Sequence, residues 1–265
     1  MTTTTSQSRG ASPPTLNVLS LFAGIGGLEL GLERAGMRVV GQVEIDPFCR
    51  RVLAKHWPEV PRHDDVRTTI DWWRAGERPP VHVVAGGFPC QPFSSAGRRR
   101  GVADERWGWP WMAAVVRALR PAYVLVENVA DLVRDADAWG WLLGDLAALG
   151  FDADWSVLPA CVMGAPHARE RVFLVAHSAQ HDGANQGAGA PPSGLRPEPR
   201  GGRRRAYTRA RGWVPEPAMG RVANGVPRRL VVDELHALGN AVVPQVAEHV
   251  GRLIVAHNGA VDRVA

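Results

Sequence analysis

A cysteine between two prolines is the residue of this chain best placed for chemistry. Cys90 lies in the stretch Pro89-Cys90-Gln91-Pro92-Phe93-Ser94, directly after an apolar run at residues 81–88 that predicts a buried strand and a turn. A thiol on a rigid loop at the end of a strand is presented to a ligand and suits a nucleophile. The alternative is a structural cysteine packed in the core, which is the more common environment of cysteine in general. The neighbouring residues favour the nucleophile.

An acidic residue and two arginines follow other predicted strands. Glu127 comes directly after the strand predicted at 123–126, and Arg169 and Arg171 lie where two further strands are joined. Because ligands bind at the carboxyl ends of strands in open α/β sheets, we expect these groups near Cys90. A thiolate can add to an electron-poor ring carbon while an acid assists at a ring nitrogen and arginines hold phosphate and orient the acid. Taken singly, Glu127 could equally cap a helix, and the alternating arginines could form a solvated strand edge.

A glycine-rich turn predicts a nucleotide-like cofactor. The turn Phe22-Ala23-Gly24-Ile25-Gly26-Gly27 joins a predicted strand to a predicted helix, and Glu44 ends the next strand, where a ribose-binding acid is expected. A nicotinamide dinucleotide and S-adenosylmethionine both fit this pattern. Glu29 occupies the place where a dinucleotide fingerprint has glycine or alanine, which favours S-adenosylmethionine. A tight turn that binds no ligand is the remaining alternative.

Composition limits the class of protein. The 265 residues suffice for one large α/β domain, 45% of them are hydrophobic, and no run of about 18 apolar residues predicts a membrane span. The net charge of +5 favours a polyanionic partner only slightly, since Lys55 is the only lysine and an arginine-rich composition also follows from a GC-rich coding sequence. The three cysteines lack metal-site spacing, which indicates a reducing cytoplasm and neither disulfides nor zinc.

Predicted strands and helices alternate along the chain, which indicates an α/β fold with a doubly wound, mostly parallel sheet. The predicted strands are 16–22, 38–43, 81–85, 123–126, 154–161 and 171–176, and the predicted helices are 28–35, 47–56, 111–119 and 138–149. Residues 178–229 break this pattern because they are rich in glycine, proline and arginine. They are either an extended recognition segment or a disordered insertion. A loop and a long amphipathic helix are expected within 231–255.

The order of these motifs resembles that of the DNA (cytosine-5) methyltransferases, from Leu16 to about Val255. Leu21–Gly27 with Glu44 looks like the motif that binds the cofactor, and Asp65-Val66 looks like the motif that contacts its adenine ring. Gly87–Ser94 looks like the loop that carries the nucleophile, and Glu127-Asn128-Val129 looks like the motif that supplies the catalytic glutamate. Arg169-Glu170-Arg171 looks like the paired-arginine motif, and Gly239–Pro244 looks like the last motif, which completes the cofactor pocket.

The resemblance implies a Rossmann-like methyltransferase fold, with S-adenosylmethionine as cofactor and double-stranded DNA as substrate. Cys90 would attack carbon 6 of a flipped-out cytosine, Glu127 would donate to ring nitrogen 3, and Arg169 and Arg171 would complete the catalytic set. The residues expected at the cofactor are Phe22, Ala23, Gly24, Ile25, Gly26, Gly27, Glu44, Ile45, Asp65, Val66, Pro89, Asn240 and Ala241. The residues expected at DNA are Gln91, Ser94, Arg98, Arg99, Arg100, Arg203, Arg204 and Arg205.

The expected domain organisation has four parts. Residues 1–15 form a disordered tail, 16–177 the catalytic domain, 178–229 a reduced target-recognition segment, and 230–257 a motif and helix that return to the catalytic domain. The protein is expected to be a monomer that uses no metal and works in the cytoplasm, encoded by a bacterium or a phage.

Three residues depart from the family pattern. Ser20 stands where the family has an acidic residue, Ile45 where many members have an aromatic ring, and His167 where the family has glutamine. The alternatives left open are a tRNA cytosine-5 methyltransferase, a catalytically silent nucleic-acid-binding relative and, more distantly, a nicotinamide oxidoreductase.

Overall fold

The computed structural model describes residues 15–90, 107–178 and 237–261. The residues predicted at DNA therefore lie outside the described part of the chain, namely Gln91, Ser94, Arg98, Arg99, Arg100, Arg203, Arg204 and Arg205. The predicted recognition segment lies outside it as well, apart from its first residue, Ser178.

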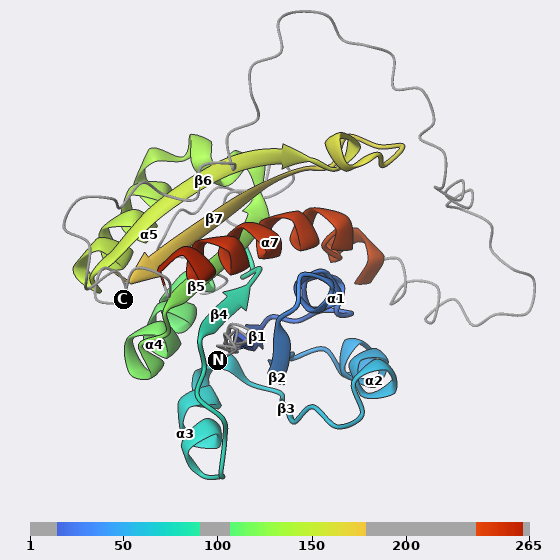
Figure 1. The fold of residues 1–265 in the computed structure, drawn as a ribbon, viewed down its shortest axis with the longest axis vertical. Coiled ribbons are helices and arrows are strands. Elements are labelled where there is room, and N and C mark those ends of the chain that lie inside the picture. The colour runs from blue at the N-terminus through green and yellow to red at the C-terminus, as the bar shows by residue number, and fades with distance from the viewer. Residues whose placement is uncertain (1–14, 91–106, 179–236, 262–265) are drawn as a thin grey trace, which may run out of the picture.

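The described residues contain a seven-stranded sheet in the order β3-β2-β1-β4-β5-β7-β6 (Figure 1). Its strands are β1 (Asn17–Leu21), β2 (Arg38–Val43), β3 (Arg62–His63), β4 (Val83–Gly86), β5 (Tyr123–Val129), β6 (Phe151–Pro159) and β7 (Glu170–Ser178). The first five pair in parallel, whereas β7 runs antiparallel between β5 and β6. The predicted doubly wound, mostly parallel α/β fold is confirmed.

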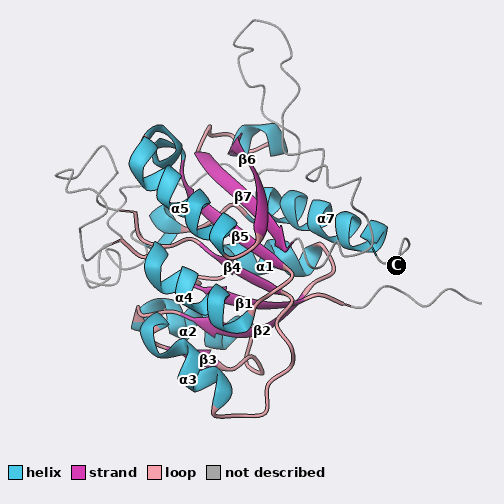
Figure 2. Ribbon diagram, turned by 90° about the vertical axis from the view of Figure 1, so that its left-hand side faces the viewer, coloured by secondary structure: helices cyan, strands magenta, loops and turns pink. Residues whose placement is uncertain are grey.

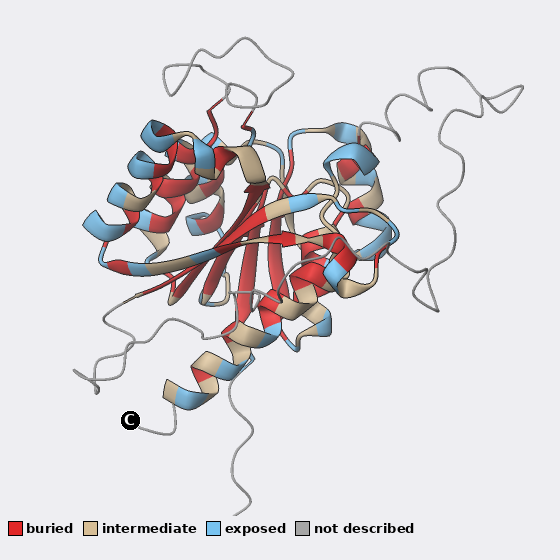
Figure 3. Ribbon diagram, turned by 90° about the horizontal axis from the view of Figure 1, so that it is seen from above, coloured by how far each residue is buried: buried red, intermediate tan, exposed pale blue. Residues whose placement is uncertain are grey.

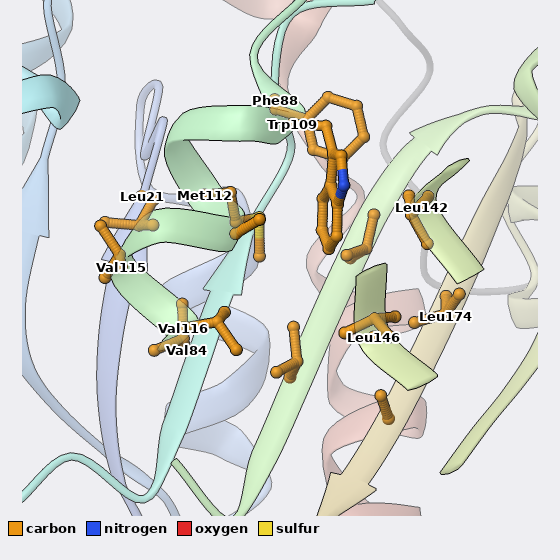
Figure 4. Close-up of a cluster of buried hydrophobic side chains, with 14 of the residues drawn as sticks. Leu21, Val84, Phe88, Trp109, Met112, Val115, Val116, Leu142, Leu146 and Leu174 are labelled. Atoms are coloured by element: carbon orange, nitrogen blue, oxygen red, sulfur yellow. The ribbon is translucent and has the colours of Figure 1, made fainter. Parts of the chain in front are cut away.

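Helices cover both faces of this sheet (Figure 2). The helices are α1 (Gly27–Arg34), α2 (Pro47–His56), α3 (Thr69–Arg74), α4 (Trp109–Leu119), α5 (Ala136–Ala148) and α7 (Pro244–Val261). Successive strand residues point to opposite faces, so Leu19 packs into the core with α4 and α5, while Val18 packs with α1 and α7. Figure 3 shows the strands buried between the two layers, and Figure 4 shows the core under α4.

Most predicted elements differ from the observed ones by one to three residues at their ends, and two such differences concern possible site residues. Glu127 and Asn128 lie inside β5 and not after it, because the strand continues to Val129 in pairing with β7. The strand predicted to end at Cys161 ends at Pro159, and Cys161 lies in a short 3-10 helix, η5 (Ala160–Met163). The sequence pattern does not predict β3 and α3, which have two and six residues and are too short to show a period.

The C-terminal helix α7 packs directly against α1, although the two are far apart in sequence (Figure 1). The contact is close because α1 presents glycine. A Cβ added to Gly31 would overlap the Cβ of Ala247 and would lie 2.5 Å from the Pro244 carbonyl oxygen. On the other helix, a Cβ added to Gly251 would lie 2.8 Å from the Ala35 Cβ. Small residues thus allow the C-terminal helix to pack closely against the first helix of the fold.

Alanine at position 31 is expected to destabilise the protein. Its methyl group must push α7 away, so the free energy of unfolding should fall by about 1–3 kcal/mol, although alanine is the better helix former. Urea denaturation measures the effect. Gly140→Ala in α5 is the matched control, because its Cβ would meet nothing within 4 Å, and it should be neutral or stabilising. Equal stability of the two variants would contradict the proposed packing constraint.

Candidate active site

A cavity of about 530 Å³ lies at the carboxyl ends of β1, β2, β4 and β5. This volume is within the range of small-molecule sites. One wall comes from the turn after β1 and the end of β2, and the other comes from the ends of β4 and β5. The C-terminal segment also lines the cavity, with Val242 against Gly27 of the turn. Its lining residues are Phe22, Ala23, Gly24, Ile25, Gly27, Leu28, Glu44, Ile45, Asp46, Cys49, Gly87, Phe88, Pro89, Cys90, Glu127, Asn128, Val129, Arg171, Ala237, Asn240, Ala241 and Val242. The structure therefore brings most of the predicted cofactor and catalytic residues together.

The carboxylate of Glu44 holds the glycine turn in place. One oxygen accepts a hydrogen bond of 2.7 Å from the Gly24 amide, and the other accepts one of 2.7 Å from the Asp46 amide. Gly24 has a positive φ of 56°, and a Cβ there would meet nothing within 4 Å, so the turn exposes backbone to the cavity. Ile45 follows Glu44 with 73% of its side chain exposed, although it is apolar and lines the cavity. The turn and β2 thus form one wall with a negative group and an exposed apolar side chain.

Cys90 lies at the opposite wall, buried to 8% exposure and paired through an isolated β-bridge with Trp107. Burial raises the pKa of its thiol to about 12, and the nearby negative charge of Asp135 adds to the effect. The thiol is therefore protonated at neutral pH in this structure. Asp135 also caps α5 by accepting a hydrogen bond from the Ala138 amide. Nothing in the local sequence pattern predicts that Asp135 lies near Cys90.

Glu127 is buried and faces an arginine. Burial raises the pKa of its carboxyl group to about 7, while the charges of Arg171 and Arg169 act in the opposite direction. The Arg171 Nε lies 3.3 Å from a Glu127 carboxyl oxygen. A Cβ on Gly87 would lie 2.8 Å from the other oxygen, so only glycine fits beside the acid without displacing it. Near neutral pH this acid is present in both its protonated and ionised forms, as a proton donor requires.

Asn128 links the acid to the cysteine loop. Its side-chain nitrogen donates a 3.0 Å hydrogen bond to the Phe88 carbonyl oxygen, two residues before Cys90. Its side-chain oxygen accepts a hydrogen bond from the Val129 amide. The bond to Phe88 joins the segment after β4 to the end of β5 and so helps to set the relative position of Cys90 and Glu127, while the local bond to Val129 orients the Asn128 amide.

Three predicted cofactor residues, Gly26, Asp65 and Val66, and one predicted catalytic residue, Arg169, are not in the cavity lining. Gly26 faces the side chain of Trp57. Asp65 forms a close ion pair with Arg67, which lowers the pKa of its carboxyl group to about 2. Val66 begins a short 3-10 helix and packs against the hydrophobic core. Arg169 turns toward the C-terminal loop and donates to two of its carbonyl oxygens. Gly26, Asp65, Val66 and Arg169 therefore lie outside the lining, although Arg169 binds the backbone of Ala241, which is part of it.

A buried acid close to the cavity was missed as a possible functional group. Glu29 in α1 is fully buried beside Leu28, and burial raises the pKa of its carboxyl group to about 7. The buried Ser20 hydroxyl lies near enough to favour the ionised form of Glu29. Ser20 stands at the position where an acidic residue was expected, and Glu29 of α1 supplies a carboxyl group beside it.

No helix in residues 15–90, 107–178 and 237–261 is long and apolar enough to cross a membrane. In the same part of the chain, no group of three or more histidine, cysteine or acidic side chains is arranged to hold a metal ion.

The fold and the cavity match a known family. The family model of the C-5 cytosine-specific DNA methylases matches residues 16–193. The chain therefore belongs to the C-5 cytosine-specific DNA methylase family, as the motifs predicted.

The similar proteins are bacterial and eukaryotic. Type II methyltransferase M2.BsuMI of Bacillus subtilis is 35% identical over 61% of this chain and 42% of its own length. Type II methyltransferase M.DsaV of Dactylococcopsis salina is 34% identical over 60% of this chain and 45% of its own. The chain thus spans less than half the length of these relatives.

Solved structures show the same fold. A putative DNA modification methyltransferase from an Escherichia coli prophage has a TM-score of 0.54 and 28% identity, over 63% of this chain and 47% of that one. A DNMT2 variant of Spodoptera frugiperda has a TM-score of 0.51 and 22% identity, over 62% and 50% of the two chains.

Proposed function

We propose that this chain transfers a methyl group from S-adenosylmethionine to carbon 5 of cytosine in double-stranded DNA. The observation that carries the proposal is one cavity in which Cys90 and Glu127 face the glycine turn and Glu44. A nucleophile, a proton donor and a nucleoside-binding wall are the groups that this reaction needs. The Type II methyltransferases among the relatives support DNA as the substrate.

The cavity fits S-adenosylmethionine by its shape and its polar groups. The open space at Gly24 allows close approach of a ligand to the backbone. The Glu44 carboxylate still has acceptor capacity for ribose hydroxyls beyond its two backbone hydrogen bonds. The exposed side chain of Ile45 offers an apolar surface for the adenine ring. When bound, the cofactor supplies an electrophilic methyl group.

Cys90 and Glu127 perform the addition step. The Cys90 thiol first gives its proton to water, and the resulting thiolate forms a bond to carbon 6 of cytosine. The ring electrons move toward nitrogen 3, which takes a proton from Glu127 and returns it when the sulfur departs. Carbon 5 is then electron-rich and accepts the methyl group. A base removes the proton from carbon 5, and departure of the Cys90 sulfur restores the aromatic ring. Arg171 orients Glu127 through their ion pair.

DNA recognition is proposed for segments outside the described residues. The target base must leave the duplex to reach Cys90, which is buried. Gln91, Ser94 and Arg98 to Arg100 directly follow Cys90 in sequence, so they are placed to contact DNA at the flipped base. Arg203 to Arg205 lie within 178–229, which we propose as a reduced target-recognition segment between the catalytic domain, 16–177, and the returning segment, 230–257. We further propose a cytoplasmic monomer of bacterial or phage origin.

Bisulfite sequencing of plasmid DNA from cells that express the chain tests this proposal. Protected cytosines in a fixed sequence context are expected. Incubation of DNA and tRNA with labelled cofactor distinguishes the polymer. Labelling of tRNA alone would overturn the assignment to DNA, and the absence of protected cytosines and of any label would overturn the enzymatic assignment.

Glu44→Ala is expected to weaken S-adenosylmethionine binding by about 1.5–3 kcal/mol. The variant loses a charged acceptor for the ribose hydroxyls and the two bonds that hold the glycine turn. Isothermal calorimetry measures the affinity, and Glu248→Ala, on the surface pair with Arg252, is the control that should leave it unchanged. If Glu44→Ala binds as tightly as the wild type, the ribose contact lies elsewhere.

A further inference from the structure

Arg169, which precedes β7, and Arg171, which lies in β7, direct their guanidinium groups to different close contacts. Arg171 lies against Glu127, whereas one nitrogen of Arg169, Nη2, donates hydrogen bonds of 2.8 Å to the Gly239 carbonyl oxygen and 2.6 Å to that of Ala241. These partners lie 70 and 72 residues away in sequence. Arg169 therefore joins the sheet to the C-terminal loop.

The loop that Arg169 holds forms part of the cavity wall. Asn240, Ala241 and Val242 line the cavity, and the Val242 backbone lies directly against Gly27 at the end of the glycine turn. Below the loop, Val242 and Val243 border the same small hollow as Leu158 of β6 and Phe173 of β7, with Arg169 and Arg171 at its rim. Apolar contact thus brings this loop onto the sheet, and Arg169 supplies directional bonds that fix its backbone.

The backbone of Arg169 also differs from a strand. Its φ is +32°, in the left-handed region that non-glycine residues seldom adopt. Such a conformation persists where surrounding contacts determine it. Arg169 precedes β7, which begins at Glu170. Its side chain therefore need not point to the same face of the sheet as that of Arg171, which lies against Glu127. The two hydrogen bonds to carbonyl oxygens hold the side chain in this direction.

We propose that Arg169 is a positioning residue that fixes the C-terminal wall of the cofactor cavity through the Gly239 and Ala241 carbonyl groups, and that it does not serve as a DNA phosphate contact. The inference rests on the proposed function for the identity of the cofactor. Arg171 then orients the catalytic acid, whereas Arg169 holds in place the loop that forms part of the cofactor cavity wall.

The test compares Arg169→Ala, Arg169→Lys and the wild type as full chains. Hydrogen exchange of the cofactor-free protein is measured at residues 237–243, and S-adenosylmethionine affinity by calorimetry. Arg169→Ala should exchange faster at this loop, bind cofactor about tenfold or more weakly, and raise KM for the cofactor more than it lowers kcat. Arg169→Lys, which keeps a charged donor, should recover part of the affinity. Arg252→Ala on the surface of α7 is the arginine control and should change neither property.

The salt dependence of DNA binding tests the excluded role. Arg169→Ala should leave the slope of log affinity against log salt unchanged. Unchanged exchange and cofactor affinity, with a slope reduced by roughly 0.9, would overturn the proposal and make Arg169 a phosphate contact. A wild-type chain that binds no S-adenosylmethionine would refute the proposed function. The exchange experiment would still decide the role of Arg169 in that case, because it needs no cofactor.

Discussion

Cys90→Ala is expected to abolish methyl transfer while the protein stays folded and continues to bind S-adenosylmethionine. The variant removes the only proposed nucleophile, and loss of a covalent catalyst costs about 10⁴-fold or more in rate. The side chain is small, and its replacement removes one sulfur atom at the edge of the core, so stability should change little. Transfer of labelled methyl groups to DNA under single-turnover conditions measures the effect.

The matched control is Cys161→Ala. Cys161 is buried like Cys90 and is also a free thiol, but it lies in η5 and does not line the cavity. This variant should retain activity close to that of the wild type. Residual activity of Cys90→Ala within tenfold of the control would exclude Cys90 as the nucleophile.

Glu127→Gln is expected to lower the rate of methyl transfer by about 10²–10⁴-fold, the usual contribution of a positioned acid. Glutamine has nearly the same shape and can remain beside Arg171 and Gly87, so cofactor affinity should be retained. An unchanged rate would assign proton donation to another group.

The pH dependence of this variant tests the same role. Attack requires the thiolate form of Cys90 and the protonated form of Glu127. The pKa of the Cys90 thiol is about 12, and that of the Glu127 carboxyl group is about 7. Below pH 7 the wild-type kcat/KM for DNA should rise with pH as the thiolate fraction grows. Above pH 7 the loss of protonated Glu127 offsets this growth, so the rate should level off. Glu127→Gln lacks the second requirement and should keep rising between pH 7 and 9. Parallel profiles for both proteins would contradict the assignment.

Local sequence patterns predict most of the helices and strands, apart from β3 and α3, and the order of the motifs. Asp46 and Pro47 define the start of α2, because an aspartate cap and a proline in the first turn are local signals. The apolar runs before the glycine turn and before Cys90 predicted β1 and β4 because their period and termini are local as well. Since parallel strands place their carboxyl ends at one edge, these local features were enough to bring Cys90 near the cofactor turn.

The partners and the protonation states of the side chains at that edge follow from the tertiary structure. Glu127 lies inside β5 because β7 pairs with it, and Arg169 turns to a loop 70 residues away while Arg171 stays at the acid. Asp65 pairs with Arg67 outside the cavity, and the buried acid of Glu29 lies near Ser20. Except for the local pair of Asp65 and Arg67, these outcomes depend on strand pairing, burial or charge between segments that are far apart in the sequence. Local patterns therefore fixed which residues reach the site, and long-range packing fixed the partner and the protonation state of each.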